Sequence, residues 1–553
     1  MSYQEIYDYV IVGGGSAGCV VAARLAEANV GKVLLIEAGG LAEQNPETLS
    51  ADGFTLAFAN DRVMWDRMSD KQSHCDNRSL YMGSGTGMGG SGSVNGMVYT
   101  RGDKKDYQQW PTGWQWQDVE PFFQQLETNL KVKPRSPTLY NDTCIAAAKS
   151  AGFKHKDKLI DGDLCGFLGY QTMNYDGTQR RSSYVAFLKD KNFANLTIKS
   201  RSKVRQLILD RHKKIAGVIY RQENRDRYCS VSKEVVLCSG ALETPKLLML
   251  SGIGPKFELA KHGIELVYDS PQVGSNLHDH PNVCVFYKAK QSPDSRYPQL
   301  YGFNRANHAT YLPQDQADTC YVFYSAPASL KESMKRMLPA VMLPPRWFHN
   351  KTLRRILRGC VDIAFKLPIL KNFLAQLYGI VVILGKPESR GKLTLNSADP
   401  DDQACISPNY YQNENDINTM VAGVKLAKQI AAQPALQAYG NFGLVAATHT
   451  EDNSKIAKWI KGATMTTFHY CGTCKMGESD LDPVNLELQL RGVQGIRIAD
   501  ASVIPETPVS ALNAPSMMIG LRAADFILQQ QPSHNSGRSQ ATTEPTIAAA
   551  SNG

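Results

Sequence analysis

The pattern of apolar positions near the start of the chain predicts a strand, a helix and a second strand. Residues 7–12 and 32–37 are short runs rich in β-branched and aliphatic side chains, and an alanine-rich segment of helical length separates them. Continuous apolar runs bounded by glycine are typical of strands buried on both faces of a parallel sheet. The two runs therefore predict a βαβ unit, the building block of a doubly wound lobe.

Further strands of the same lobe are expected far along the chain. Residues 233–238 and 495–499 are apolar runs followed by small residues, and parallel strands deliver such turns to one ligand crevice. Residues 196–199, 204–210 and 215–221 predict a meander of short antiparallel strands between them. The expected fold class is therefore mixed α/β, with a Rossmann-like lobe assembled from discontinuous segments.

A second lobe is expected where this pattern changes. Strands and helices mix without a glycine-rich turn over residues 285–461, which predicts a mixed-sheet lobe inserted into the first. The expected division is 5–284 for the first lobe, with some insertions from the second, 285–461 mainly for the second, and 462–528 for a return to the first. Residues 529–553 are rich in Gln, Ser, Thr, Ala and Pro, which predicts a disordered tail.

Composition and charge are those of a globular protein with more than one domain. The chain has 553 residues, of which 42% are hydrophobic and 20% charged, and its net charge is +9. This mild excess, without a Lys/Arg run or a recognisable binding motif, argues against nucleic acid as a partner. Twelve irregularly spaced cysteines in a long chain favour a reducing compartment over a disulfide framework.

The sequence predicts a cytoplasmic location, with peripheral contact at the inner membrane as an addition. Residues 1–7 lack the features of a signal peptide, and no apolar run approaches the ~20 residues of a transmembrane helix. Residues 346–371 carry seven bases and one acid among Leu, Ile, Phe and Trp. This basic amphipathic segment is suited to an anionic membrane surface; a solvated helix face or an oligomer contact are the alternatives.

A glycine-rich turn joins the first strand to its helix. The spacing of Gly13, Gly15 and Gly18 is the one in which the first glycine makes the turn, the second lets a pyrophosphate approach, and the third permits close helix packing. Ser16 begins the helix, whose N-terminal end carries partial positive charge. Glu37 ends the second strand and suits ribose hydroxyls, which disfavours a 2′-phosphate. The turn therefore predicts a dinucleotide of the FAD or NAD type.

Longer motifs decide between these two cofactors. They lie at residues 88–102, 240–254, 274–281, 387–395, 469–477 and 499–505. In order and spacing this set resembles the glucose-methanol-choline (GMC) family of FAD-dependent oxidoreductases, and the resemblance extends over residues 5–528. It implies that the first lobe binds FAD, that the second binds substrate, and that a histidine stands above the flavin where the lobes meet.

The resemblance assigns roles to individual residues. His469 matches the base that takes the hydroxyl proton of an alcohol while hydride leaves for flavin N5, and imidazole titrates near neutral pH. The second polar group of the family, counted from Asp500, falls on Ala511, so either Asn513 substitutes for it or it is absent. The residues expected to bind FAD are Gly13, Gly15, Ser16, Gly18, Glu37, Ala38, Gly89, Gly90, Ser91, Asn95, Gly96, Met97, Val98, Val204, Ser239, Gly240, Asp500, Ala501, Asn513 and Pro515.

Two departures from the family pattern change the expectation. Residues 84–88 read Ser-Gly-Thr-Gly-Met and lack two cations that the family usually carries there, which should weaken or reshape contacts on the flavin side. Val94 stands where members with covalently attached flavin have a histidine, so FAD is expected to bind non-covalently. Cys471 and Cys474 form a CxxC pair outside any thioredoxin-like pattern, and we expect buried thiols. No metal site is expected.

The expected reaction is the oxidation of a small alcohol to an aldehyde or ketone, with oxygen or a quinone as the electron acceptor. Two alternatives stay open. The first is non-redox or light-driven use of the same scaffold, as in hydroxynitrile lyases and fatty-acid photodecarboxylases; Ala511 leaves room for it, and His469 argues against it. The second is a flavin-binding protein without turnover, which the altered turn at 84–88 permits.

Overall fold

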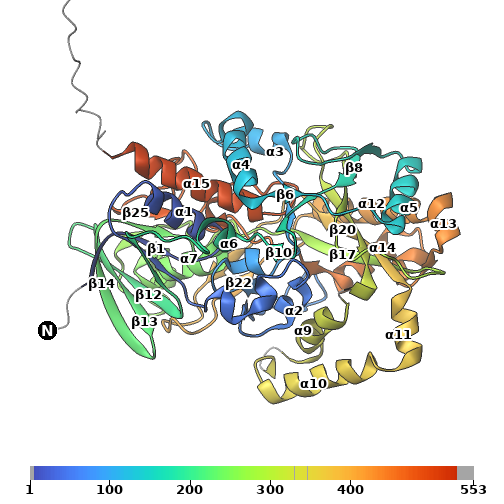
Figure 1. Ribbon diagram of the computed structural model, residues 1–553, viewed down its shortest axis with the longest axis horizontal. Coiled ribbons are helices and arrows are strands. Elements are labelled where there is room, and N and C mark those ends of the chain that lie inside the picture. Colours follow the sequence, from blue (N-terminus) through green and yellow to red (C-terminus); the bar gives the residue numbers. More distant parts are fainter. Residues whose placement is uncertain (1–4, 329, 345–346, 532–553) are drawn as a thin grey trace, which may run out of the picture.

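The first of two large sheets contains the predicted βαβ unit. The computed structural model describes residues 5–328, 330–344 and 347–531 (Figure 1). In it β1 (Glu5–Val12) lies parallel to β2 (Val33–Ile36), and α1 (Ser16–Glu27) connects them. All of β2 and the last half of β1 are buried, as expected for strands covered on both faces.

Segments far apart in the sequence complete this seven-stranded sheet. β11 (Leu196–Lys199) lies parallel to β2, and the long strand β14 (Arg225–Leu237) lies parallel to β1. The start of β14 pairs with β13 (Ile215–Gln222), which pairs with β12 (Ser202–Leu209) in the predicted antiparallel meander. The end of β14 pairs in parallel with β25 (Ile496–Ile498). The expected Rossmann-like lobe built from discontinuous segments is therefore confirmed.

The second large sheet is mixed and has eight strands. At its centre β17 (Pro281–Lys288), β20 (Leu377–Leu384) and β19 (Thr319–Ser325) are antiparallel neighbours. The other members are β18 (Leu300–Asn304), β8 (Phe167–Tyr170), β7 (Lys154–Lys156), β23 (Phe442–Gly443) and β24 (Met465–Thr466). Two of these strands, β7 and β8, come from the first third of the chain, as an insertion would. The division at 284 and 461 stays a prediction.

Helices pack against both sheets, and most of the short strands form smaller sheets. Among the helices of the C-terminal third, α12 (Glu414–Ala431) packs beside β20 and α15 (Asn513–Gln529) packs beside α1. The remaining helices of the body are α2 (Phe54–Ala59), α3 (Lys104–Gln108), α4 (Trp116–Leu130), α5 (Leu139–Ser150), α6 (Ser183–Phe187), α7 (Gly240–Leu250), α8 (Lys256–Lys261), α13 (Pro434–Tyr439) and α14 (Asn453–Ala463). The short strands are β3 (Met64–Trp65), β4 (Ser84–Gly85), β5 (Val98–Tyr99), β6 (Val132–Lys133), β9 (Thr172–Asp176), β10 (Gln179–Arg180), β15 (Ile253–Gly254), β16 (Tyr268–Asp269), β21 (Lys392–Thr394) and β22 (Cys405–Ser407).

Three helices between β19 and β20 form a projection from the body. α9 (Leu330–Met342) packs against α2, α10 (Lys351–Ala364) packs against α9 at the edge of the molecule, and α11 (Pro368–Ala375) leads back to β20 (Figure 1). We call α10 and α11 the arm. Of the basic segment 346–371, Arg346 lies outside the described residues. No helix within the described ranges is long and apolar enough to cross a membrane.

The predicted tail lies almost wholly outside the described residues. Its first residue, Gln529, is the last residue of α15, and the description ends at Gln531. All twelve cysteines are free thiols, in agreement with the expected absence of a disulfide framework.

Candidate active site

Both lobes border one cavity of about 600 Å³, and most of the predicted site residues line it. These are Gly13, Gly15, Ser16, Glu37, Ala38, Gly90, Ser91, Asn95, Gly96, Val98, Val204, Ser239, Gly240, His469, Asp500, Ala501 and Asn513. Four others, Gly18, Gly89, Met97 and Pro515, do not line it. The fold therefore brings residues from both ends of the chain around one space.

The three glycines of the first turn differ in what surrounds them. A Cβ on Gly18 would lie 1.9 Å from the carbonyl oxygen of Gly13, and one on Gly13, where φ is +105°, would lie 2.5 Å from that of Cys238. Packing therefore requires both glycines. A Cβ on Gly15 would have no neighbour nearer than 4.0 Å and would enter the cavity. The open space at Gly15 fits the pyrophosphate approach expected of a dinucleotide site.

A second glycine loop lies directly against this turn. The N–H of Gly89 donates to the carbonyl oxygen of Gly14 at 2.7 Å, and a Cβ on Gly90 would lie 2.8 Å from the Cα of Gly15. Gly90 itself has a φ of +51°. Two backbones can come this close only without side chains, so the two loops together form a cradle of exposed peptide groups for anionic oxygens.

Glu37 joins the two loops. Its Oε2 accepts from the N–H of Gly14 at 2.7 Å, and its Oε1 accepts from those of Gly39 at 2.7 Å and Gly87 at 2.9 Å. The Thr86 hydroxyl also lies 3.5 Å from Oε1. A carboxylate has about four acceptor positions, so the position left for a ligand hydroxyl is on Oε2, which accepts from Gly14 alone. The ribose contact stays a prediction, and the structure adds a scaffold role that the sequence did not reveal.

Asp500 acts as a cap in this structure. Its Oδ2 accepts from the N–H of Gly240 at 2.8 Å and from Thr244 Oγ1 at 2.6 Å, and its Oδ1 accepts from the N–H of Ser502 at 2.8 Å. These bonds tie the start of α7 to the segment that follows β25. Burial raises the pKa of the Asp500 carboxyl. Its contact with FAD stays a prediction.

The two predicted asparagines both line the cavity. Asn95 Oδ1 accepts from the buried guanidinium of Arg180 at 2.8 Å and from the N–H of Met97 at 3.0 Å. Asn513 Nδ2 donates to Ser16 Oγ at 2.8 Å, at the N-terminal end of α1. This bond places Asn513 at the phosphate-binding end of the helix; its catalytic role stays a prediction. Sequence analysis did not identify Arg180 as a site residue, because it belongs to none of the motifs.

His469 is held by its backbone and by one ring nitrogen. Phe468 precedes it with a φ of +64°, and the His469 N–H donates to Asp279 Oδ1 at 2.7 Å. The Nδ1 atom of His469 lies 2.9 Å from Nδ1 of His280 and 3.1 Å from Thr467 Oγ1. Its Nε2 atom makes no hydrogen bond with the described residues, and the side chain lines the cavity. Burial lowers the pKa of His469 to about 4.

His280 was missed as a site residue, although it lies within the motif at 274–281. It also lines the cavity, and its Nε2 lies 3.0 Å from Thr507 Oγ1. The Thr507 hydroxyl in turn reaches the carbonyl oxygen of Pro508 at 3.3 Å. Burial, followed by the neighbouring His469, lowers the pKa of His280 well below its ordinary value. Two neutral imidazoles therefore meet Nδ1 to Nδ1, and one must donate to the other.

The cations absent from residues 84–88 are partly replaced from elsewhere. Arg67, which lines the cavity, donates from Nη1 to Ser84 Oγ at 2.7 Å and from Nη2 to Glu243 Oε1 at 2.8 Å. An arginine therefore lies next to the turn in the folded chain, and the expected effect on contacts at the flavin side stays a prediction. Its sequence position gave no signal, because Arg67 belongs to none of the motifs.

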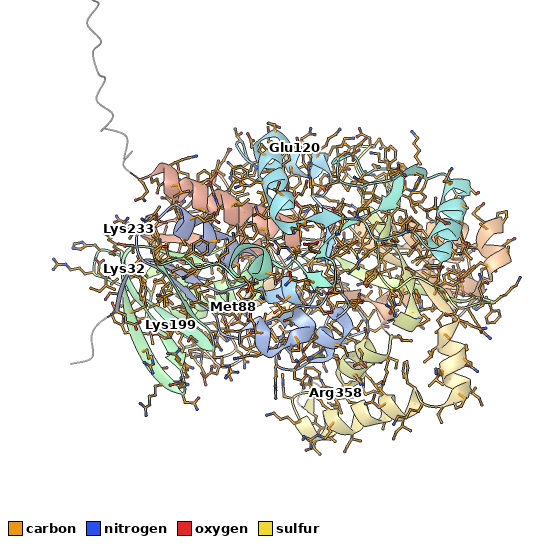
Figure 2. The ribbon with its side chains drawn as sticks, viewed as in Figure 1. Lys32, Met88, Glu120, Lys199, Lys233 and Arg358 are labelled. Atoms are coloured by element: carbon orange, nitrogen blue, oxygen red, sulfur yellow. The ribbon has the colours of Figure 1, made fainter. Side chains whose placement is uncertain are left out.

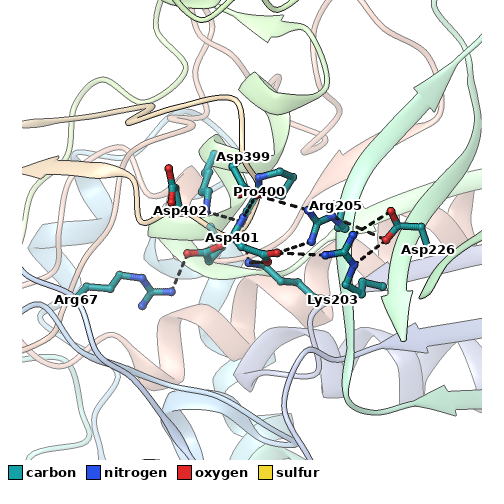
Figure 3. Close-up of polar contacts among 11 residues, drawn as sticks. Arg67, Lys203, Arg205, Asp226, Asp399, Pro400, Asp401 and Asp402 are labelled. Atoms are coloured by element: carbon teal, nitrogen blue, oxygen red, sulfur yellow. Dashed lines mark hydrogen bonds and ion pairs between the residues drawn. The ribbon is translucent and has the colours of Figure 1, made fainter. Parts of the chain in front are cut away.

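Two lysines complete a basic wall beside the loop 399–402 (Figure 3). Lys203 and Lys246 both line the cavity, and their Nζ atoms donate to the carbonyl oxygen of Pro400 at 2.8 and 2.9 Å. Lys203 also pairs with Asp401 at 3.1 Å, and Arg205 pairs with the same carboxylate at 2.7 Å. These bonds hold a loop of the C-terminal half against β12 and α7 of the first lobe.

Within the described part of the chain we find neither a reactive dithiol nor a group of side chains arranged as metal ligands. Cys471 and Cys474 are buried free thiols, and burial raises the pKa of both, so they are not thiolates. Among the residues that the structure describes, no group of three or more His, Cys, Asp or Glu side chains is arranged to hold a metal ion.

Comparison with known proteins identifies the family. The N-terminal domain of the GMC oxidoreductases matches residues 7–282, and their C-terminal domain matches residues 387–520. The chain belongs to the GMC oxidoreductase family. The family expected from the motifs is thereby confirmed, together with the expected class of enzyme, an FAD-dependent oxidoreductase.

Relatives of this GMC oxidoreductase match it over almost its whole length. An alcohol dehydrogenase [acceptor] of Pseudomonas putida is 31% identical, over 95% of this chain and 96% of its own. An oxygen-dependent choline dehydrogenase of Chromohalobacter salexigens is 30% identical, over 96% of both chains. Among solved structures, pyridoxine 4-oxidase from Mesorbium loti superposes with a TM-score of 0.82 at 24% identity, over 95% of this chain and all of its own. A formate oxidase gives 0.81 at 24% identity, over 96% of this chain and 99% of its own. These structures confirm the fold.

Proposed function

We propose that this GMC oxidoreductase oxidises the CH–OH group of an alcohol to an aldehyde or ketone, with His469 as the base. The single observation that carries the proposal is the placement of His469: its Nδ1 is bound on the protein side, and its Nε2 is unpartnered in a cavity that the two glycine loops also line. The alcohol and choline dehydrogenases among the relatives support a hydroxyl-bearing substrate.

The bonds around His280 favour the ring protonation that a base requires. If the Thr507 hydroxyl donates to Pro508, it accepts from His280 Nε2–H, which leaves the lone pair of a neutral His280 on Nδ1. His469 then donates from Nδ1–H to that atom, and its own lone pair lies on Nε2, on the cavity side. Nε2 accepts the hydroxyl proton of the alcohol. His280 is a positioning residue in this scheme.

The cavity residues fit FAD as the resident cofactor. Gly15 and Gly90 would receive the pyrophosphate, Glu37 the ribose, and Asn95 polar atoms on the flavin side. When bound, FAD supplies the acceptor for the hydride that leaves the carbinol carbon, and oxygen or a quinone returns it to the oxidised state. Val94 lines the cavity without a nucleophilic atom, which supports non-covalent binding. We place the enzyme in the cytoplasm, with peripheral contact at the inner membrane through residues 346–371.

The test is the visible spectrum of the purified protein, recorded anaerobically before and after addition of primary and secondary alcohols. We expect flavin bleaching by at least one alcohol, and a loss of about 10²- to 10⁴-fold in its rate in His469→Ala. His212→Ala is the matched control, because His212 is exposed on the β12–β13 turn and does not line the cavity. Admission of air then separates an oxidase from a dehydrogenase.

Failure of every alcohol to bleach bound flavin would contradict the proposal. Cyanohydrins, and carboxylic acids under blue light, would then test the non-redox and light-driven alternatives. A flavin that no substrate changes would favour the silent binding protein.

A further inference from the structure

Exposed apolar side chains concentrate on and beside the arm. Among the described residues, eight of the twenty exposed large hydrophobic side chains lie between 341 and 373: Val341, Met342, Trp347, Ile356, Ile363, Leu367, Ile369 and Phe373. Ile369 is 87% exposed, and no residue of α11 is buried. Apolar surface gathered in this way marks an interaction site, whereas scattered single residues do not.

The arm separates its basic residues into two groups. Arg354 and Arg358 of α10 both pair with Asp61, at 2.9 and 2.7 Å. Figure 2 shows Arg358 on the side of α10 that faces the body. The buried Arg336 of α9 pairs with the same carboxylate at 3.0 Å. These arginines therefore attach α10 to the body, and they contribute no free charge to its outer surface.

The outer surface keeps the other basic residues. Lys351, Arg355, Lys366 and Lys371 are exposed, and none of them forms an ion pair with the residues that the structure describes. The one acid of the arm, Asp362, is already paired at 3.0 Å with both Lys331 and Lys335 of α9. The four unpaired cations thus lie beside the exposed Ile356, Ile363 and Ile369 on the arm, and no free acid of the arm lies among them.

We propose that the arm docks on the surface of an anionic lipid bilayer. Its isoleucines would enter the boundary between headgroups and acyl chains, and its four cations would meet lipid phosphates. Charge favours this partner over a second copy of the chain, because a symmetric contact would set the cationic surface against itself. The inference deepens the proposed membrane contact by naming the surface and its lipid class.

Docking at the arm would bring the bilayer next to the cavity. Ser333 of α9 and Phe58 of α2 both line the cavity, and these two helices pack against each other. Leu56, also on α2, is exposed. An alcohol or an electron acceptor dissolved in the lipid would therefore reach the cavity from the side on which the arm binds.

The test is flotation of the flavin-loaded protein with vesicles, without any alcohol. One vesicle set is phosphatidylcholine alone, and the other contains phosphatidylglycerol in addition. We expect binding to the second set, decreasing with salt. Each free cation should contribute about fivefold to the partition coefficient, so the triple variant Lys351→Gln/Lys366→Gln/Lys371→Gln should bind about 100-fold more weakly. Ile363→Ser/Ile369→Ser should also lose binding to the second set, although it keeps every cation of the arm.

The matched control is Lys455→Gln/Lys458→Gln, which removes two exposed, unpaired cations from α14, outside the arm, and should retain binding. Absence of binding to the anionic vesicles, or equal losses in arm and control variants, would overturn the inference. So would a dimer in sedimentation velocity that the isoleucine variant dissociates, because the surface would then join two copies. Alcohol-dependent bleaching is measured without vesicles, so failure here leaves the proposed reaction standing.

Discussion

Replacement of His280 tests whether the second histidine determines the protonation of His469. In His280→Leu, the acceptor 2.9 Å from His469 Nδ1 becomes an apolar group of similar size, and position 280 is only 1% exposed to solvent. A buried donor left without its acceptor costs about 1–3 kcal/mol. Thr467 Oγ1 remains 3.1 Å from the same nitrogen, so we expect the lower part of that range. About 1–2 kcal/mol corresponds to a 5- to 30-fold fall in the rate of flavin reduction.

Two measurements separate positioning from a general loss of structure. The rate of anaerobic flavin reduction is followed by stopped flow, and ¹⁵N NMR of the His469 ring shows which nitrogen carries the proton. His280→Asn is the conservative variant, because Asn Oδ1 can take the place of the ring Nδ1; its rate should lie within about threefold of the native rate. If His280→Leu reduces flavin at the native rate with an unchanged ¹⁵N pattern, His280 has no positioning role.

Three further predictions follow from the same structure. Burial lowers the pKa of His469 to about 4, so the imidazole stays neutral above that pH. The rate of flavin reduction should therefore be independent of pH between about 5.5 and 8. A rate that falls below about pH 6.5 would contradict this prediction. Gly15→Ala should leave the stability of the apoprotein within about 0.5 kcal/mol of the native value, yet weaken FAD binding in a fluorescence titration. Gly18→Ala should yield little folded protein, because its Cβ would lie 1.9 Å from a carbonyl oxygen. Asp61→Asn should lower the free energy of unfolding in urea by about 1–3 kcal/mol and expose α10 to proteolysis. Asp362→Asn, at an exposed pair, should lower the same free energy by less than about 1 kcal/mol. Equal decreases in the two variants would show that the inward ion pairs do not hold the arm.

The outline of the first lobe was predictable because its signals are local. Residues 7–12 and 32–37 are apolar on both faces, and the turn between them needs glycine at positions where any Cβ would collide. Requirements of this kind can be recognised from a few consecutive residues. The GMC motifs then ordered the remaining segments, and sixteen of the predicted cofactor residues were found around one cavity.

The same local information did not reveal the protein partners of several residues. The turn at 84–88 looked depleted in cations, but Arg67 supplies one at Ser84. Asp500 and Glu37 were expected to bind the cofactor, and their oxygens are found mainly on backbone N–H groups. The net basic charge of 346–371 also overstated the free charge, since Arg354 and others are paired inward.

The sequence by itself determined the βαβ unit, the family and the motif that contains His469, since each depends on the order of neighbouring residues. Only the tertiary structure decided that His280, separated from His469 by 189 residues, lies 2.9 Å from it, and that two arginines of α10 pair with Asp61 while its other two basic residues form no ion pair with the described residues. The physical reason is that hydrogen bonds and ion pairs act over a few ångströms in space, whatever the separation along the chain. The pairing of strands and the packing of helices set those distances, so they cannot be recognised from any run of consecutive residues.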